Sequence, residues 1–199
     1  MDSTQLNLLK DQYNDYFIIE HDIRINVKPF AGEEPDEQQF ERLIPEPFLM
    51  AGEQVLLEQS ALKSLNRLGE LAEELAHYLR IQARKIDSMM RYILMQQDDP
   101  QCRHFSHSYG GSALCFDHDT AFAEGELLEV KMFLEHNDGA VFALVRVIGV
   151  EPVGEKFRIR TTYTRIREQD RELIVRASLH QQSRQLKRKA ELRQQQGQA

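Results

Sequence analysis

A long stretch of strong helix formers dominates the first half of the chain. From Glu53 to Gln97 there is no proline and one glycine, Gly69, while leucine, alanine, glutamate, arginine and methionine recur throughout. This composition predicts one long helix, over residues 53–99. Since an α-helix rises about 1.5 Å per residue, it would span on the order of 65 Å. That is much longer than a domain formed by a chain of this size, so we expect the helix to self-associate.

Apolar residues recur every seven positions along this predicted helix, in two series displaced by three. That spacing is typical of the a and d positions of a coiled coil. The predicted oligomer interface consists of Leu65, Leu68, Ala72, Leu75, Leu79, Gln82, Ile86, Met89 and Ile93. The flanking positions Tyr78, Ala83, Met90 and Tyr92 are also apolar or aromatic. So wide a stripe favours a bundle of more than two helices.

Alternation of apolar and polar residues predicts strands on both sides of the helix. One strand runs from Phe17 to Val27, and three antiparallel strands follow over residues 128–134, 140–150 and 157–164. The middle one of these three is apolar almost throughout apart from Arg146, so we expect it to be buried on both faces. The fold class is therefore α+β, a small antiparallel barrel with a coiled-coil helix inserted after its first strand and a helix at its end.

These elements divide the chain into five parts. We assign residues 1–30 to the first barrel strand, 31–52 to an acidic connection, 53–99 to the heptad helix, 100–167 to the remaining barrel and 168–199 to a C-terminal helix and tail. The acidic connection contains three prolines and is expected to be irregular.

Charge and composition exclude several classes of protein. The formal net charge is −7, which repels phosphate polyanions, so no nucleic-acid partner is expected. The two cysteines, Cys102 and Cys115, and an N-terminus without the basic and apolar runs of a secretory signal favour a cytoplasmic protein. No uncharged apolar stretch approaches the roughly 20 residues of a membrane helix, so no membrane insertion is expected.

Four runs after the helix resemble the PilZ family. SYGGSALCF, GELLEV, VFALVRVIGVEP and RIREQDRELIVRASLHQQ occur in this order between residues 103 and 188. The most specific is the start of the closing helix, DRELI, from Asp170 to Ile174. The resemblance implies a barrel without catalytic residues or cofactor, which acts by contacts with a signalling protein in cyclic-di-GMP-linked regulation.

PilZ domains that bind cyclic di-GMP use an Arg-x-x-x-Arg motif beside the first strand. The corresponding positions here are Asn14 and Ile18, and no arginine precedes Arg24. Arginine supplies paired donors to guanine and phosphate that other side chains cannot replace. We therefore expect cyclic-di-GMP binding to be weak or absent.

The second ligand motif of the family, Asp/Asn-x-Ser-x-x-Gly, is degenerate as well. Its three defining positions are occupied by Ser108, Gly110 and Ala113. The remnant ligand site then consists of these three residues with Gly111 and Arg103. A glycine pair also fits a tight bend in a barrel strand. A subclass of PilZ proteins that lacks the ligand motifs and carries a long heptad helix forms tetramers, and the resemblance implies a homotetramer here.

Two alternatives remain open at this point. The chain is a cyclic-di-GMP receptor if Arg103, Arg146, Arg158 or Arg160 replaces the missing motif. It is a metal protein or an enzyme if its cysteines and histidines converge. That cluster comprises Cys102, His104, His107, Cys115 and His118, but its spacing matches no familiar set of zinc ligands, so neither a metal nor a catalytic site is assigned.

The C-terminal helix carries a run of basic residues. These are Arg184, Lys187, Arg188, Lys189 and Arg193. A solvated basic face is the usual explanation of such a run. A specific alternative is a salt-sensitive contact with the acidic residues 33–41 of a neighbouring subunit.

Overall fold

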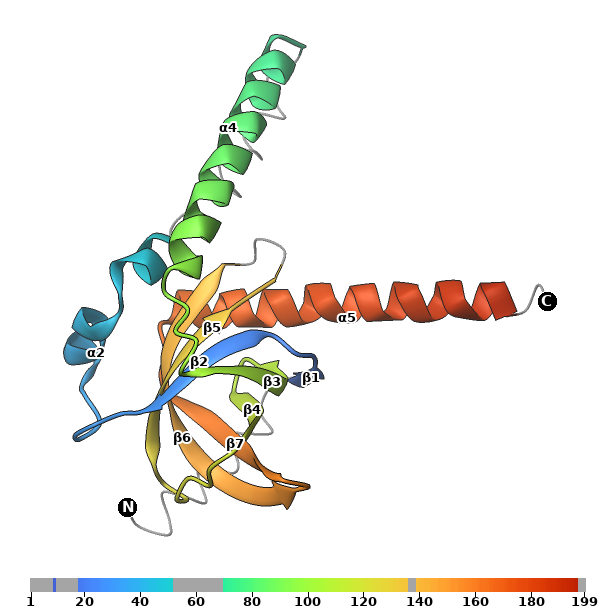
Figure 1. Cartoon of the computed structure of the whole chain (residues 1–199). Helices are drawn as coiled ribbons and strands as arrows, with labels where there is room; N and C mark the ends of the chain where they lie inside the picture. Colours follow the sequence, from blue (N-terminus) through green and yellow to red (C-terminus); the bar gives the residue numbers. More distant parts are fainter. Residues whose placement is uncertain (1–8, 10–17, 52–69, 136–138, 197–199) are drawn as a thin grey trace.

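The computed structural model describes Leu9 and residues 18–51, 70–135 and 139–196. Seven strands form one antiparallel sheet (Figure 1). They are β1 Ile18–Glu20, β2 Arg24–Pro29, β3 Arg103–Gly110, β4 Ala113–His118, β5 Leu127–Phe133, β6 Ala140–Val153 and β7 Lys156–Arg165. The sheet closes into a six-stranded barrel in the order β2-β5-β6-β7-β4-β3, because β3 pairs with both β4 and β2. The predicted α+β barrel is therefore confirmed.

The strand predicted over residues 17–27 is two strands, so the prediction of one continuous strand was wrong. β1 pairs with the end of β3 and β2 pairs with its beginning. Between them the hydroxyl of Ser106 accepts a hydrogen bond from the Ile23 amide at 2.9 Å and donates one to the His21 carbonyl at 2.7 Å. A side chain thus replaces ladder bonds at the break, which alternation of residues does not reveal.

Strand β6 is buried on both faces, as its apolar sequence predicted. Val141, Ala143, Val145 and Val147 point into the barrel, where they belong to its main core. The alternate residues Ala140, Phe142 and Leu144 belong to a second core on the outer face. A strand that contributes to two cores needs apolar residues at every position.

The second core is covered by residues 30–51, which follow β2. This segment was predicted to be irregular, but it contains helix α2, Glu37–Leu43, and further helical residues 46–51. A capping box starts α2, since the Asp36 side chain accepts from the Gln39 amide at 2.8 Å and the Gln39 side chain accepts from the Asp36 amide at 3.0 Å. Phe40 then packs on Phe142 with ring centroids 5.9 Å apart.

Helix α4, Glu70–Met95, projects from the barrel (Figure 1). It is the described part of the helix predicted over residues 53–99 and ends at Met95, four residues before the predicted end. Beyond it, Asp98 and Asp99 bind Asn26 of β2, and Leu94 belongs to the outer core. Residues 52–69 lie outside the described part of the chain.

Helix α5, Glu168–Gln196, closes the barrel and then runs past it (Figure 1). Its first turns carry Leu173, Ile174 and Ala177 into the main core. Its last attachments to the barrel include a hydrogen bond of 3.0 Å from Gln185 to the Glu20 carbonyl. Residues 186–193 are exposed on every side of the helix, so the described contacts with the barrel end at about Gln185.

Candidate functional site

The remnant of the ligand motif lies in the tight turn between β3 and β4. Ser108, Gly110, Gly111 and Ala113 are all buried. The Gly111 carbonyl accepts a hydrogen bond from Arg171 of α5, and the neighbouring Ser112 carbonyl accepts one from the Thr162 hydroxyl at 2.9 Å. These backbone acceptors are already satisfied by β7 and α5, so the turn is closed by the chain's own residues.

Arg103 does not join this turn. It begins β3, whereas Gly110 ends it, and seven residues of extended strand span about 24 Å. Its guanidinium instead binds Asp98, with 3.0 Å between Nη2 and Oδ2. The five residues predicted to form a remnant site are therefore not brought together.

The other arginines considered as replacements are also held in ion pairs. Arg146 pairs with Glu34. Arg158 binds Asp117 through two hydrogen bonds, at 2.9 and 3.1 Å. Arg160 pairs with Glu151 at 2.6 Å. Each guanidinium therefore already has a carboxylate partner, which neutralises its charge and competes with a phosphate for its donors.

The cysteines and histidines are dispersed over the barrel. The rings of His104 and His118 lie near each other, with centroids 4.4 Å apart, while Nε2 of His107 lies 3.3 Å from Arg158. Within the described ranges, no group of three or more His, Cys, Asp or Glu residues is arranged to hold a metal ion. Burial raises the pKa of Cys115 to about 11, so its thiol is protonated at neutral pH and is a poor nucleophile.

The base of α4 is joined to the barrel by a buried carboxylate. Asp98, whose side chain is 3% exposed, binds Arg24 and Arg103, each at 3.0 Å. Asn26 donates to Asp98 at 2.9 Å and accepts from the Asp99 amide at 2.8 Å. Two acids before Pro100 are typical of the end of a helix, and nothing in that sequence indicates the partners of Asp98. This joint fixes where α4 leaves the barrel.

Above this joint, α4 has two different sides. Leu94 and Met90 pack against the outer core of the barrel. The adjacent side carries exposed apolar residues, namely Leu75, Tyr78, Leu79, Ile86, Met89, Tyr92 and Ile93. Of the predicted interface, Leu75, Leu79, Ile86, Met89 and Ile93 lie on this exposed side and Gln82 is half-buried, while Leu65, Leu68 and the Ala72 side chain lie outside the described residues.

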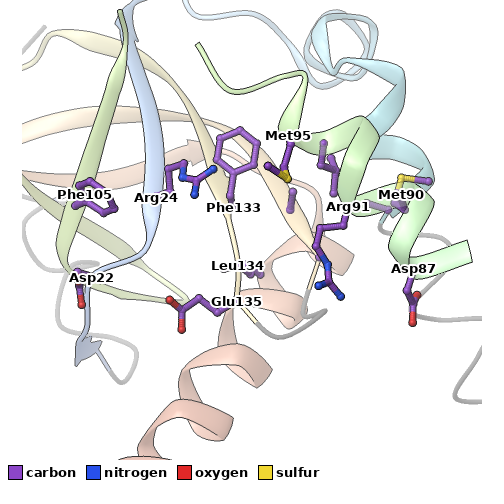
Figure 2. A pocket seen from close by; sticks show the side chains of 14 residues that line it. Asp22, Arg24, Asp87, Met90, Arg91, Met95, Phe105, Phe133, Leu134 and Glu135 are labelled. Atoms are coloured by element: carbon purple, nitrogen blue, oxygen red, sulfur yellow. The ribbon is translucent and has the colours of Figure 1, made fainter. Parts of the chain in front are cut away.

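A pocket of about 390 Å³ opens where α4 meets the barrel. Figure 2 shows Met95 of α4 beside Phe133 of β5, with Met90 further along the helix. Phe105 is 56% exposed at this site. The pocket falls within the range of about 300–1,000 Å³ of small-ligand sites, and its apolar lining continues the exposed side of α4.

No family model and no curated protein sequence matches the chain. Among solved structures, the chain is similar to a pathogenic protein from Xanthomonas campestris described as a new tetrameric PilZ domain self-assembled via an unusual helical bundle. The two share 11% identity with a TM-score of 0.57, over 87% of this chain and 92% of that one. The fold is that of a PilZ domain.

A second structural neighbour is the Bacillus subtilis inhibitor of motility MotI/DgrA. It matches with 10% identity and a TM-score of 0.46, over 86% of this chain and 52% of that one, so the chain spans about half the length of that protein. None of the helices in the described residues is long and apolar enough to cross a membrane.

Proposed function

We propose that this protein is a non-catalytic signalling scaffold of the cytoplasm, in which helices α4 of several copies associate and display their PilZ barrels to a signalling protein. The proposal places it in cyclic-di-GMP-linked regulation, without strong binding of cyclic di-GMP by the chain itself. The assembly we propose is a homotetramer.

The observation that carries the proposal is the exposed apolar side of α4. Tyr92 is 67% exposed and Met89 is 59% exposed, although both are large apolar side chains. Burial of such side chains contributes about 25 cal/mol per Å², which makes association of these faces favourable. The heptad spacing supplies the geometry. The similar Xanthomonas campestris protein is described as assembling through a helical bundle, which supports a bundle of four.

Weak nucleotide binding is supported by the turn between β3 and β4. Its backbone groups are engaged by Thr162 and Arg171, and the four candidate arginines are paired with carboxylates. A cyclic dinucleotide would have to compete with these partners for the guanidinium donors.

Assembly is tested with charged residues in the seam. Leu75→Glu combined with Leu79→Glu should give monomers, because each pair of associating helices would bury uncompensated carboxylates. Light scattering on purified protein gives the mass. The control is Ser88→Glu, which adds a carboxylate at an exposed position outside the seam and should leave the mass unchanged. A mass that is the same for the wild type and the double variant would overturn the assembly.

Nucleotide binding is tested separately by calorimetric titration with cyclic di-GMP at moderate salt. We expect no heat that saturates at micromolar ligand. Saturating heat that disappears in Arg158→Ala or Arg160→Ala would instead identify an unconventional receptor, and would contradict the proposal of a scaffold.

A further inference from the structure

The C-terminal part of α5, which we call its outer half, is cationic, and its side chains over residues 186–193 are exposed. Residues 176–196 contain six Lys and Arg and one Glu, a net charge of +5, so the rest of the chain, with −7 in total, carries −12. Residues 186–193 are exposed, including Leu186 at 60% and Leu192 at 50%. An isolated helix of this length is marginal in water, so a partner that neutralises it would stabilise it.

A surface of the opposite kind lies on and around α2. We call it the acidic α2 surface. Its exposed carboxylates belong to Glu33, Asp36, Glu37, Glu41 and Glu46, with Arg42 as an exposed base, which gives a net charge of −4. Leu43 is 43% exposed and Met50 is 47% exposed beside them. The acidic α2 surface therefore offers negative charge to the basic residues of the outer half of α5 and apolar side chains to its exposed leucines.

The two surfaces cannot meet within one chain. Figure 1 shows α2 on one side of the barrel and the C-terminal end of α5 on the opposite side. Glu34, just before α2, is already bound to Arg146 and Arg165 of the same chain, and these bonds hold the start of this region on the barrel. Contact between the two surfaces therefore requires two molecules.

We propose that the outer half of α5 docks on the acidic α2 surface of a second copy of the chain. The exposed leucines favour a protein partner, because a phosphate backbone offers no apolar complement to them. The charge of −12 on the remainder of the chain would also repel a nucleic acid. Each copy uses two different surfaces, so the contact runs head to tail and must either close into a ring or continue as a filament. The assembly through α4 proposed above would favour the ring.

Site-specific cross-linking tests the contact. Two proteins are prepared, one with Leu43→Cys and one with Leu186→Cys, at positions that are both exposed. Mixed under mild oxidation, they should form a disulfide-linked dimer, and each protein alone should form far less. The native thiols provide little background, since Cys115 is buried and Cys102 is half-buried.

Charge reversal supplies the matched control. Changing Lys187, Arg188 and Lys189 to Glu in the second protein should lower the cross-link at least about tenfold, as should high salt, because several exposed ion pairs are lost together. Glu37→Arg with Glu41→Arg in the first protein should do the same alone, and should restore the cross-link when combined with the reversed α5.

The outcomes separate this inference from the proposed assembly. A cross-link that persists in the Leu75→Glu/Leu79→Glu background supports the contact even if α4 does not associate. No cross-link in a protein that assembles normally overturns the contact. Binding of a fluorescent DNA duplex that is lost on reversal of Lys187, Arg188 and Lys189, in the absence of any cross-link, overturns it in favour of a nucleic-acid partner.

Discussion

Helices α4 and α5 both project from the same barrel, but they differ in the chemistry of what they expose. Helix α4 contains four acids and four Lys or Arg, and its exposed side is apolar. The outer half of α5 has a net charge of +5 over residues 176–196 and few exposed apolar residues. Apolar association withstands salt, whereas contacts between exposed charges are screened by it. One barrel can thus carry a persistent and an adjustable contact.

The bases of the two helices are built alike. Asp98 at the base of α4 binds Arg24 and Arg103. Asp170 at the base of α5 binds Arg167 through two hydrogen bonds, at 2.7 and 2.8 Å. Each base therefore contains a buried carboxylate paired with arginine, but Asp98 bonds to two barrel strands, whereas Asp170 bonds to a residue three positions earlier.

The largest effect on stability is expected from Phe48, in the helical residues 46–51 that cover the outer core of the barrel. Phe48 is fully buried and lies against Phe133 and Phe142. Phe48→Ala should lower the free energy of unfolding by about 3–5 kcal/mol, the usual cost of a large cavity. Urea unfolding followed by circular dichroism measures this change. Met50→Ala, at a position that is 47% exposed, is the control and should cost less than about 1 kcal/mol.

A smaller effect is expected at the joint itself. Asp98→Ala removes a buried carboxylate and leaves two arginines without it. Because their side chains are 41% and 39% exposed, water partly replaces the lost partner, and we expect about 2 kcal/mol, below the usual cost of breaking a fully buried pair. Asp119→Ala, which breaks an exposed pair with Lys156, should change urea stability by less than about 1 kcal/mol. Equal losses in the two variants would contradict a special role of Asp98.

The smallest effect is a difference in how Asp98 and Asp170 contribute to stability as pH changes. Burial acts to raise the pKa of Asp98, but hydrogen bonds from Arg103 and Asn26 and the charges of Arg103 and Arg24 outweigh it and hold the pKa below its usual value. Burial also raises the pKa of Asp170, and here Arg167 does not compensate. A lowered pKa stabilises the fold above the unfolded-state value near 4 and loses that contribution as pH falls.

A raised pKa has the opposite sign, since its contribution is present below pH of about 4 and is lost as pH rises. Urea unfolding between pH of about 3 and 6 should therefore show opposite trends. The free energy of unfolding of the wild type minus that of Asp98→Asn should increase with pH. The same difference for Asp170→Asn should decrease with pH. Parallel trends would show that the two bases are electrostatically equivalent.

Alternation of residues was enough to predict the barrel. Strands β5, β6 and β7 alternate or are apolar throughout, and each is found near its predicted position. The helical residues between 36 and 51 were missed because prolines and a run of acids are typical of irregular segments. The pair Asp36 and Gln39, three residues apart, was the available signal, since this spacing forms a capping box.

The end of α4 was not predictable from the heptads. Helix formers continue to Gln97, whereas the helix ends at Met95 and the chain then bonds to Asn26 of β2 through Asp98 and Asp99. For the ligand motif, the sequence predicted a remnant site that joined Arg103 to Ser108 and Gly110. Arg103 lies at the other end of β3 from Gly110, and the sequence alone did not show that this separation keeps them apart.

The inserted region begins and ends at one place on the barrel. Asn26 of β2 pairs with Arg103 of β3, and the Val27 amide donates to the Cys102 carbonyl at 2.9 Å. In topological terms, residues 30–101 are a very long hairpin loop, so their length can change over evolution without altering the barrel's register. They are nevertheless not dispensable, since their removal would uncover Phe142 and Leu144 on β6. A graft of this cassette onto another PilZ barrel would have to bring with it an apolar patch to rest on.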